Sequence, residues 1–202
     1  MNKLLSILAC AGVVVTALPV HALTLVSTTA QGNSVTAAVS AGFLPTITTD
    51  IGFVEFGTVS LTFRLSAADA GGLAAFNAVI GNLMPGRGIA GLELRLNRGT
   101  FELVGAVTPS FSAVVWVLGA PQQQRITFAP AEAFGIDLGN PFAAAGQADW
   151  LFGFAGMQAD ETFTLTVSAV PEPQVWALML AGASVLVMMR RPRSPLQRVN
   201  DA

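Results

Sequence analysis

Apolar and polar side chains alternate along three segments of the chain, residues 59–66, 92–97 and 162–168. In the segment that begins at Val59, apolar residues take every second position and serine, threonine or arginine takes the others. Successive side chains of a β-strand point to opposite faces of the sheet, so this period of two predicts strands with one buried and one solvated face. Such strands must bury their apolar face against a second layer.

Further short segments have strand character, and glycine and proline separate them. These candidates are residues 23–30, 34–41, 101–103, 112–118, 125–128 and 149–154. Many short strands joined by such turns are typical of two packed antiparallel sheets. We therefore predict a mainly β protein with a single antiparallel β-sandwich-like domain over residues 23–169. An N-terminal signal-peptide helix and a C-terminal hydrophobic helix are expected to flank it.

Two local features of this domain can be interpreted further. The turn Asn97-Arg98-Gly99 separates two strand candidates, which predicts a hairpin with Gly99 at positive φ. Residues 66–84 are ambiguous, because Leu73, Phe76 and Ile80 have helical spacing while three glycines in the same stretch disfavour a helix.

The N-terminus has the three parts of a secretory signal peptide. Lys3 supplies the positive start, residues 4–18 form the apolar run, and the small residues around His21 predict cleavage after Ala22. A lipoprotein signal at Cys10 is a weaker alternative, because the apolar run before it is short. A retained membrane anchor conflicts with Pro19 and with the length of the run.

The residue types missing from the predicted domain exclude several kinds of chemistry. The only cysteine, histidine and lysine of the chain are Cys10, His21 and Lys3, and the chain has no tyrosine. Disulfides, zinc sites and Ser-His or Cys-His catalysis are therefore not expected in residues 23–169. That segment has five arginines and ten acids, a net charge of −5, which argues against nucleic acid as a partner.

The last thirty residues carry the most specific pattern of the chain. A Pro-Glu-Pro triplet is followed by an aromatic residue, an apolar segment and an arginine cluster. The motif residues are Val170, Pro171, Glu172, Pro173 and Trp176. This combination resembles the PEP-CTERM sorting signal of Gram-negative, polysaccharide-producing bacteria. The resemblance implies processing by an exosortase, a membrane transpeptidase-like enzyme, with the signal over residues 170–194 and a cytoplasmic tail over 195–202.

The apolar segment after the motif is short for a transmembrane helix. Residues 175–189 would form a helix of roughly 22 Å, whereas the hydrocarbon core is ~30 Å thick. Such a helix suits transient retention, with the arginines on the cytoplasmic side of the membrane. The predicted membrane residues are Val175, Leu178, Leu180, Val185, Leu186 and Met189, and the positive cluster is Arg190, Arg191 and Arg193. An ordinary tail anchor that is never cut is the alternative.

Two patterns suggest ligand sites but have plainer structural explanations. Glycines at 86, 88 and 91 match the dinucleotide-binding spacing, but Pro85 precedes them and a predicted strand follows, whereas that motif needs a helix after it. Asp137 and Asn140 offer oxygen ligands for calcium, but with Gly139 they are typical of a turn. We therefore predict no metal and no cofactor.

Trp116 and Trp150 are the candidates for stacking on a sugar ring. Both lie in strongly apolar segments, so we expect both to be buried. An exposed Trp150 beside acidic loops would favour carbohydrate binding. Ten carboxyl groups leave glycoside hydrolysis open as a reaction, but the sequence does not pair any two of them.

The expected function is therefore that of an exported, non-enzymatic surface or extracellular-matrix protein. It would cross the inner membrane, stay anchored transiently through its C-terminus, and then reach the cell surface or the medium. The matrix role is implied by the resemblance, and the non-enzymatic character follows from the missing residue types. The alternatives are a carbohydrate-binding module for extracellular polysaccharide, with or without calcium, and a carboxylate-dependent glycoside hydrolase.

Overall fold

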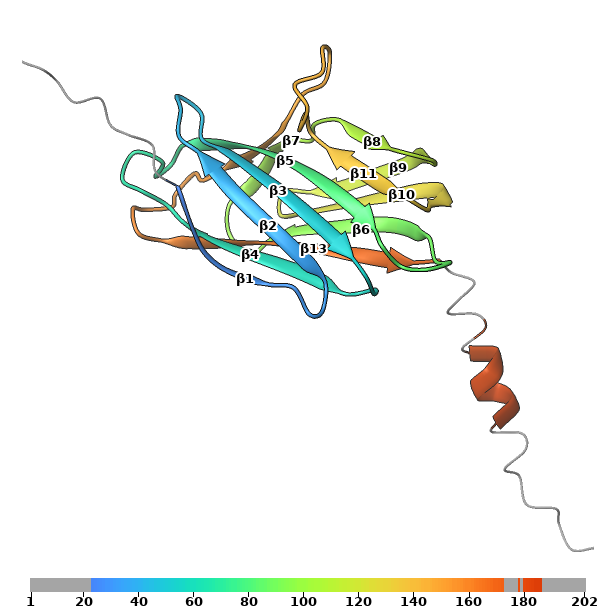
Figure 1. The fold of residues 1–202 in the computed structure, drawn as a ribbon. Helices are drawn as coiled ribbons and strands as arrows, with labels where there is room; N and C mark the ends of the chain where they lie inside the picture. The colour runs from blue at the N-terminus through green and yellow to red at the C-terminus, as the bar shows by residue number, and fades with distance from the viewer. Residues whose placement is uncertain (1–22, 173–177, 179, 187–202) are drawn as a thin grey trace, which may run out of the picture.

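A computed structural model describes residues 23–172, 178 and 180–186 of the chain, and these form two packed β-sheets followed by a short helix (Figure 1). The six-stranded sheet has the order β1 (Thr24–Thr29), β4 (Thr58–Arg64), β13 (Thr162–Pro171), β6 (Ile89–Leu96), β10 (Gln123–Glu132), β9 (Ala113–Ala120). The seven-stranded sheet has the order β2 (Ser34–Ser40), β3 (Thr46–Phe53), β5 (Leu73–Asn82), β11 (Gly135–Leu138), β8 (Val107–Pro109), and β12 (Trp150–Gly153) joins β5 to β7 (Thr100–Leu103). The mainly β, sandwich-like architecture is thus as predicted.

The alternating segments form the strands that were expected from them. In β4 and β13 every second residue is buried, and the rings of Phe63 and Phe163 stack across the pair with centroids 5.3 Å apart. The ring of Phe163 also meets Phe152 of the other sheet edge-on at 6.4 Å. Aromatic pairs in these geometries add to the free energy gained from burying their area. The inner faces of the two sheets therefore share one core.

The outer face of the same strands carries hydroxyl groups in register. Threonines and serines of β4 and β13 lie directly opposite one another, and their side chains form three hydrogen bonds across the strands. These are Thr58–Ser168 at 3.0 Å, Ser60–Thr166 at 3.4 Å and Thr62–Thr164 at 3.0 Å. Paired cross-strand hydroxyls fix the strand register, because a slip of one residue would turn them into the core.

The predicted hairpin around Gly99 is wrong, although its turn is right. Gly99 has φ +78°, as expected, but the strand after it, β7, pairs with β12 of the other sheet rather than with β6. Both edges of β6 are already occupied by β10 and β13. The side chain of Phe101 instead joins Trp150 and Phe152, with ring centroids 5.8 and 5.4 Å away. The turn therefore carries the chain from one sheet to the other.

The ambiguous segment 66–84 contains a strand, β5, and not a helix. Nearly all residues of β5 are buried, because β5 has neighbouring strands on both edges and is covered on both faces. A strand buried on both faces does not show the apolar-polar alternation of a half-buried strand. The chain reaches β5 from β3 through β4 of the other sheet, so β3 and β5 run parallel. The sandwich is therefore mixed rather than purely antiparallel. β3, β8 and β11 were not predicted as strands from the sequence.

A buried carboxylate at the end of β10 ties two loops to the sheet. Glu132 is fully buried, and its oxygens accept hydrogen bonds from the backbone N–H groups of Phe111, Ser112, Phe134 and Gly135 and from the Ser112 hydroxyl, at 2.8 to 3.2 Å. Burial alone raises the pKa of Glu132, but the hydrogen bonds from Ser112, Phe134 and Phe111 outweigh it and lower the pKa to about 2. The ionised carboxylate is therefore part of the folded structure.

We expect Glu132→Gln to lower the free energy of unfolding at pH 7 by about 3 kcal/mol, because an amide presents an N–H₂ group to donors. The folded-state pKa lies below the ordinary value of 4.5, so the stabilisation is full above that value and is lost as the pH falls toward about 2. Urea unfolding at several pH values measures both effects. Glu102→Gln, at an exposed carboxylate of β7, is the control. A deficit of Glu132→Gln that did not shrink with falling pH would contradict this account.

Candidate binding surface along strand β9

Strand β9 is an exposed apolar edge of the six-stranded sheet. It pairs with β10 on one side, and among the described residues no strand pairs with its other side. Trp116 and Leu118 are each 61 % exposed and Val115 is 59 % exposed. The expectation that Trp116 is buried is therefore wrong. An unbroken apolar run usually indicates a covered strand, but β9 lies at the edge of its sheet and both of its faces are exposed.

The outer face of β9 places Trp116 beside polar side chains of β10. Trp116 lies opposite Thr127 and Leu118 lies opposite Arg125 in the antiparallel register. These four residues line a shallow groove of about 220 Å³. Among the described residues no ion pair includes Arg125, and its guanidinium offers N–H donors to a ligand. The groove thus combines an aromatic platform with a cation and a hydroxyl.

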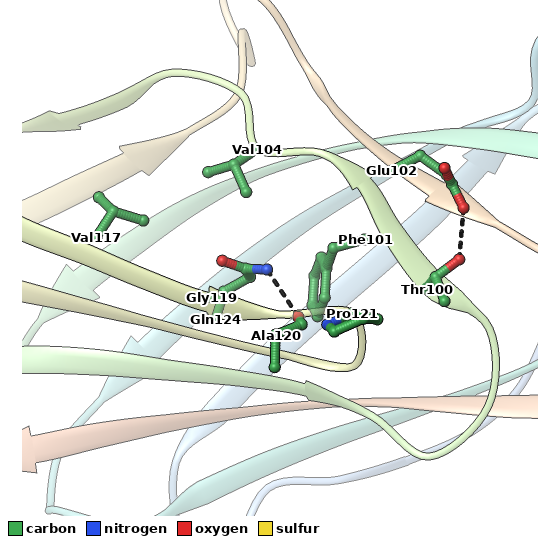
Figure 2. A pocket seen from close by; sticks show the side chains of 9 residues that line it. All are labelled: Thr100, Phe101, Glu102, Val104, Val117, Gly119, Ala120, Pro121 and Gln124. Carbon is green, nitrogen blue, oxygen red and sulfur yellow. Dashed lines mark hydrogen bonds between the residues drawn. The ribbon is translucent and has the colours of Figure 1, made fainter.

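The inner face of β9 borders a second, larger groove at the end of the sandwich (Figure 2). It has a volume of about 760 Å³ and lies between β7 and the β9–β10 hairpin. Its lining residues are Thr100, Phe101, Glu102, Val104, Val117, Gly119, Ala120, Pro121 and Gln124. The buried Gln124 donates a hydrogen bond from Nε2 to the Ala120 carbonyl at 3.0 Å. A Cβ at Gly119 would lie against the Gln124 amide, so a larger residue there would require the Gln124 side chain to move.

An exposed aromatic pair continues this surface at the start of β9. The rings of Phe111 and Phe134 meet edge-on with centroids 5.9 Å apart, and both side chains are more than half exposed. They sit on the two loops that the Glu132 carboxylate holds together. Sequence reasoning missed both residues, because they lie outside any periodic segment.

Trp150, the preferred sugar platform of the two tryptophans, is fully buried, as its apolar segment predicted. Its indole Nε1 donates a hydrogen bond to the Ala106 carbonyl at 3.1 Å, and its ring contacts Phe101. The condition under which Trp150 would support carbohydrate binding is therefore not met. Any aromatic platform on this domain has to be sought elsewhere, and Trp116 offers one.

The candidate calcium loop uses its polar groups internally. Asp137 lies in β11, where burial raises the pKa of its carboxyl, and it is not part of the turn. The backbone N–H of Asn140 donates to Asp149 Oδ1 at 2.7 Å, and the Asn140 side chain bonds to Ala144 and Gln147. Within the part of the chain that the structure describes, no three or more His, Cys, Asp or Glu side chains are grouped as metal ligands.

The other sequence candidates have structural explanations as well. The glycine pattern at 86–91 is a turn that enters β6: Gly86 has φ +66°, and a Cβ at Gly91 would lie 2.5 Å from the Ile126 carbonyl oxygen. This agrees with the interpretation as a glycine-rich loop. Asp160 and Glu161 precede β13, and the Glu161 carboxylate accepts hydrogen bonds from Arg98 and from the Gln158 N–H.

The sorting motif begins inside the sheet. Val170 and Pro171 are the last residues of β13 and pair with Gly91 and Ile89, so the sheet extends two residues past the boundary predicted at 169. Leu178 and residues 180–186 are helical, and the described apolar side chains among them are exposed. The described residues include no helix long and apolar enough to span a membrane. Pro173, Val175, Trp176, Met189, Arg190, Arg191, Arg193 and the cleavage residue Ala22 lie outside the described residues.

Comparisons of the chain with protein-family models, with curated proteins and with solved structures give no match.

Proposed function

We propose that the protein is an exported, non-enzymatic surface or extracellular-matrix protein that an exosortase sorts and cleaves at its C-terminus. The main support for the proposal is that the described β-sandwich and its core are complete before the C-terminal tail begins. Among the described residues, the last member of the core is Ala169, and β13 ends two residues later at Pro171. The exposed helical residues 178 and 180–186 add nothing to that core. A tail outside the core is free to serve as a membrane-held sorting signal and to be removed.

The surface of the domain supports binding rather than catalysis. Three of its carboxylates, those of Glu132, Asp149 and Glu161, accept hydrogen bonds within loops and turns, so they have structural roles. The exposed apolar side chains of β9 are instead typical of a contact surface, since such patches on soluble domains mark interaction sites. In this proposal the N-terminal signal peptide directs export across the inner membrane, and the apolar C-terminal helix gives a transient anchor.

The sorting proposal predicts the end of the secreted chain. Expressed in a host with an exosortase, the extracellular form should end close to Pro173, without the arginine cluster. Pro173→Ala alters the motif outside β13, so it should leave folding unchanged and shift the protein toward the membrane fraction with its tail intact. Arg198→Ala, beyond the cluster, is the matched control and should behave as the wild type. Mass spectrometry of both fractions measures this; an intact arginine-rich tail outside the cell would contradict it.

Binding of extracellular polysaccharide is a second candidate function, and the exposure of Trp116 favours it. The apolar face of a sugar ring stacks on an indole, and neighbouring donors bind its hydroxyl groups. The outer groove offers both, because Arg125 and Thr127 lie on the strand next to Trp116. Carboxylate-dependent hydrolysis of such a polymer remains the least supported alternative, given the structural roles of the carboxylates above.

For this second function, Trp116→Ala and Arg125→Ala should each weaken retention by exopolysaccharide in affinity electrophoresis several-fold. Phe142→Ala removes another exposed ring, from the loop after β11, and should have no effect. A calcium chelator should leave retention unchanged, because Asn140 and Asp149 bond within their own loop. Equal retention of Trp116→Ala and the wild type would rule out this groove as the polysaccharide site.

A further inference from the structure

The free edges of the two sheets differ in how they are protected against pairing with another strand. Natural edge strands are kept short, bulged, charged or proline-containing for this purpose. β8 has only three residues and ends at Pro109, and β1 is bulged between Leu25 and Ser27. β9 has eight residues, none of them charged and none of them proline. β9 is bulged at Val115, but from Trp116 to Ala120 it has no further bulge, and its exposed side chains are apolar. β2, the free edge of the other sheet, is also uncharged, but its exposed side chains are those of Ser34, Thr36, Ala38 and Ser40. Among the free edges, β9 therefore presents the most apolar surface.

We infer that two copies of the chain associate by antiparallel pairing of their β9 strands. In an antiparallel ladder every second residue turns its N–H and C=O toward the neighbouring strand, so half of the β9 groups face the open edge. A second β9 would satisfy them and would shield the apolar side chains on both of its faces. This inference rests on the edge itself and holds whether or not the chain is exported.

The register of the pair follows from the faces of the strand. A two-fold axis perpendicular to the sheet keeps outer residues opposite outer residues, so Trp116 must face an outer residue of its partner. With the axis at Val117, Trp116 lies opposite Leu118 of the partner and Val117 lies opposite its own copy. Gly119, which has no side chain, then lies opposite Val115, where β9 bulges relative to β10. In this register, apolar side chains meet at positions 116 to 118, and Val115 faces the space left by Gly119.

Charge does not oppose a second copy as the occupant. The like charges considered across this interface are the two Arg125 guanidinium groups, each on β10, the strand next to β9. Three strand spacings of about 4.8 Å separate them, roughly 14 Å, which exceeds the Debye length of about 8 Å at physiological salt. Pairing of β9 with the hydroxyl-rich β1 would instead place Trp116 and Leu118 beside serines and threonines. The apolar edge is therefore better matched by itself.

The resulting dimer joins two six-stranded sheets into one continuous sheet. The partner strand also covers the open side of the inner groove, which Val117 and Gly119 line. A single strand pair buries less than the roughly 800 Å² per partner of a standard stable interface. We therefore expect a dimer in concentration-dependent equilibrium with the monomer rather than an obligate one.

A charge exchange tests both the dimer and its register. Full-length chain, in a detergent that keeps its apolar ends dispersed, is studied by sedimentation over a range of concentrations. Trp116→Lys and Leu118→Glu should each shift the equilibrium toward monomer, and an equimolar mixture of the two variants should restore dimers. In the mixture the introduced ammonium group at 116 lies opposite the introduced carboxylate at 118. Both positions are 61 % exposed, so the unfolding free energy of each variant should stay near that of the wild type.

Cysteine cross-linking gives an independent readout. In a Cys10→Ser background the chain has no other cysteine, so Val117→Cys should form a disulfide-linked dimer under mild oxidation, because the two-fold axis brings the two thiols together. Val26→Cys, on the opposite edge strand β1, should stay monomeric. Monomeric wild type at all concentrations, unaffected dimers in the charge variants, no recovery in the mixture, or cross-linking through Val26→Cys alone would each overturn the inference.

Discussion

Strand β13 is the element on which the whole six-stranded sheet depends. It is the last strand in the sequence, yet it lies between β4 and β6 and so joins the β1–β4 pair to the β6–β10–β9 group. Its inner residues are fully buried, and Phe163 contacts aromatic rings of both sheets. The sandwich therefore cannot close before the chain has been made up to Pro171. Because the sorting motif starts on this strand, a cut before Val170 would remove ladder pairs, whereas a cut after Pro173 would leave every ladder pair of the described residues in place.

Alternation in the sequence predicted several strands that have one buried and one solvated face, but it did not identify all of them, since β3 was missed. Alternation identified β4, β6 and β13, because each has one buried and one solvated face. β5 is buried on both faces, and its segment had helical spacing in the sequence, whereas β9 is exposed on both faces although it is an unbroken apolar run. An apolar run does not show whether a strand lies inside its sheet, where the run is buried, or at the edge of the sheet, where it is exposed. The opposite burial of Trp116 and Trp150 follows from their strand positions alone.

The polar interactions that shape the candidate surface were beyond sequence reasoning for a different reason. Glu132 binds backbone N–H groups of residues on two loops, and a backbone group can come from any residue type. Its partners Phe111 and Phe134 are 21 and 2 positions away, so no fixed spacing marks them. Local turn chemistry was easier, since Gly99 and Gly139 were placed in turns from sequence and both have positive φ. Features set by local conformation, such as these turns, were therefore predictable from the sequence, whereas contacts between distant segments, such as those of Glu132, were not.

The distribution of side chains across the six-stranded sheet decides what kind of assembly its edges permit. Hydroxyl groups cover the outer face of β4 and β13, charged and amide groups follow on β6 and β10, and apolar groups end the series on β9. A sheet with two similar apolar edges would pair head to tail and grow into fibres. Here one edge is apolar and the other is rich in hydroxyls, so the favourable contact uses the same edge of both copies. Such a contact is closed by its two-fold symmetry, and assembly stops at the pair, which leaves the hydroxyl face and the outer ends of the joined sheet exposed to the surroundings.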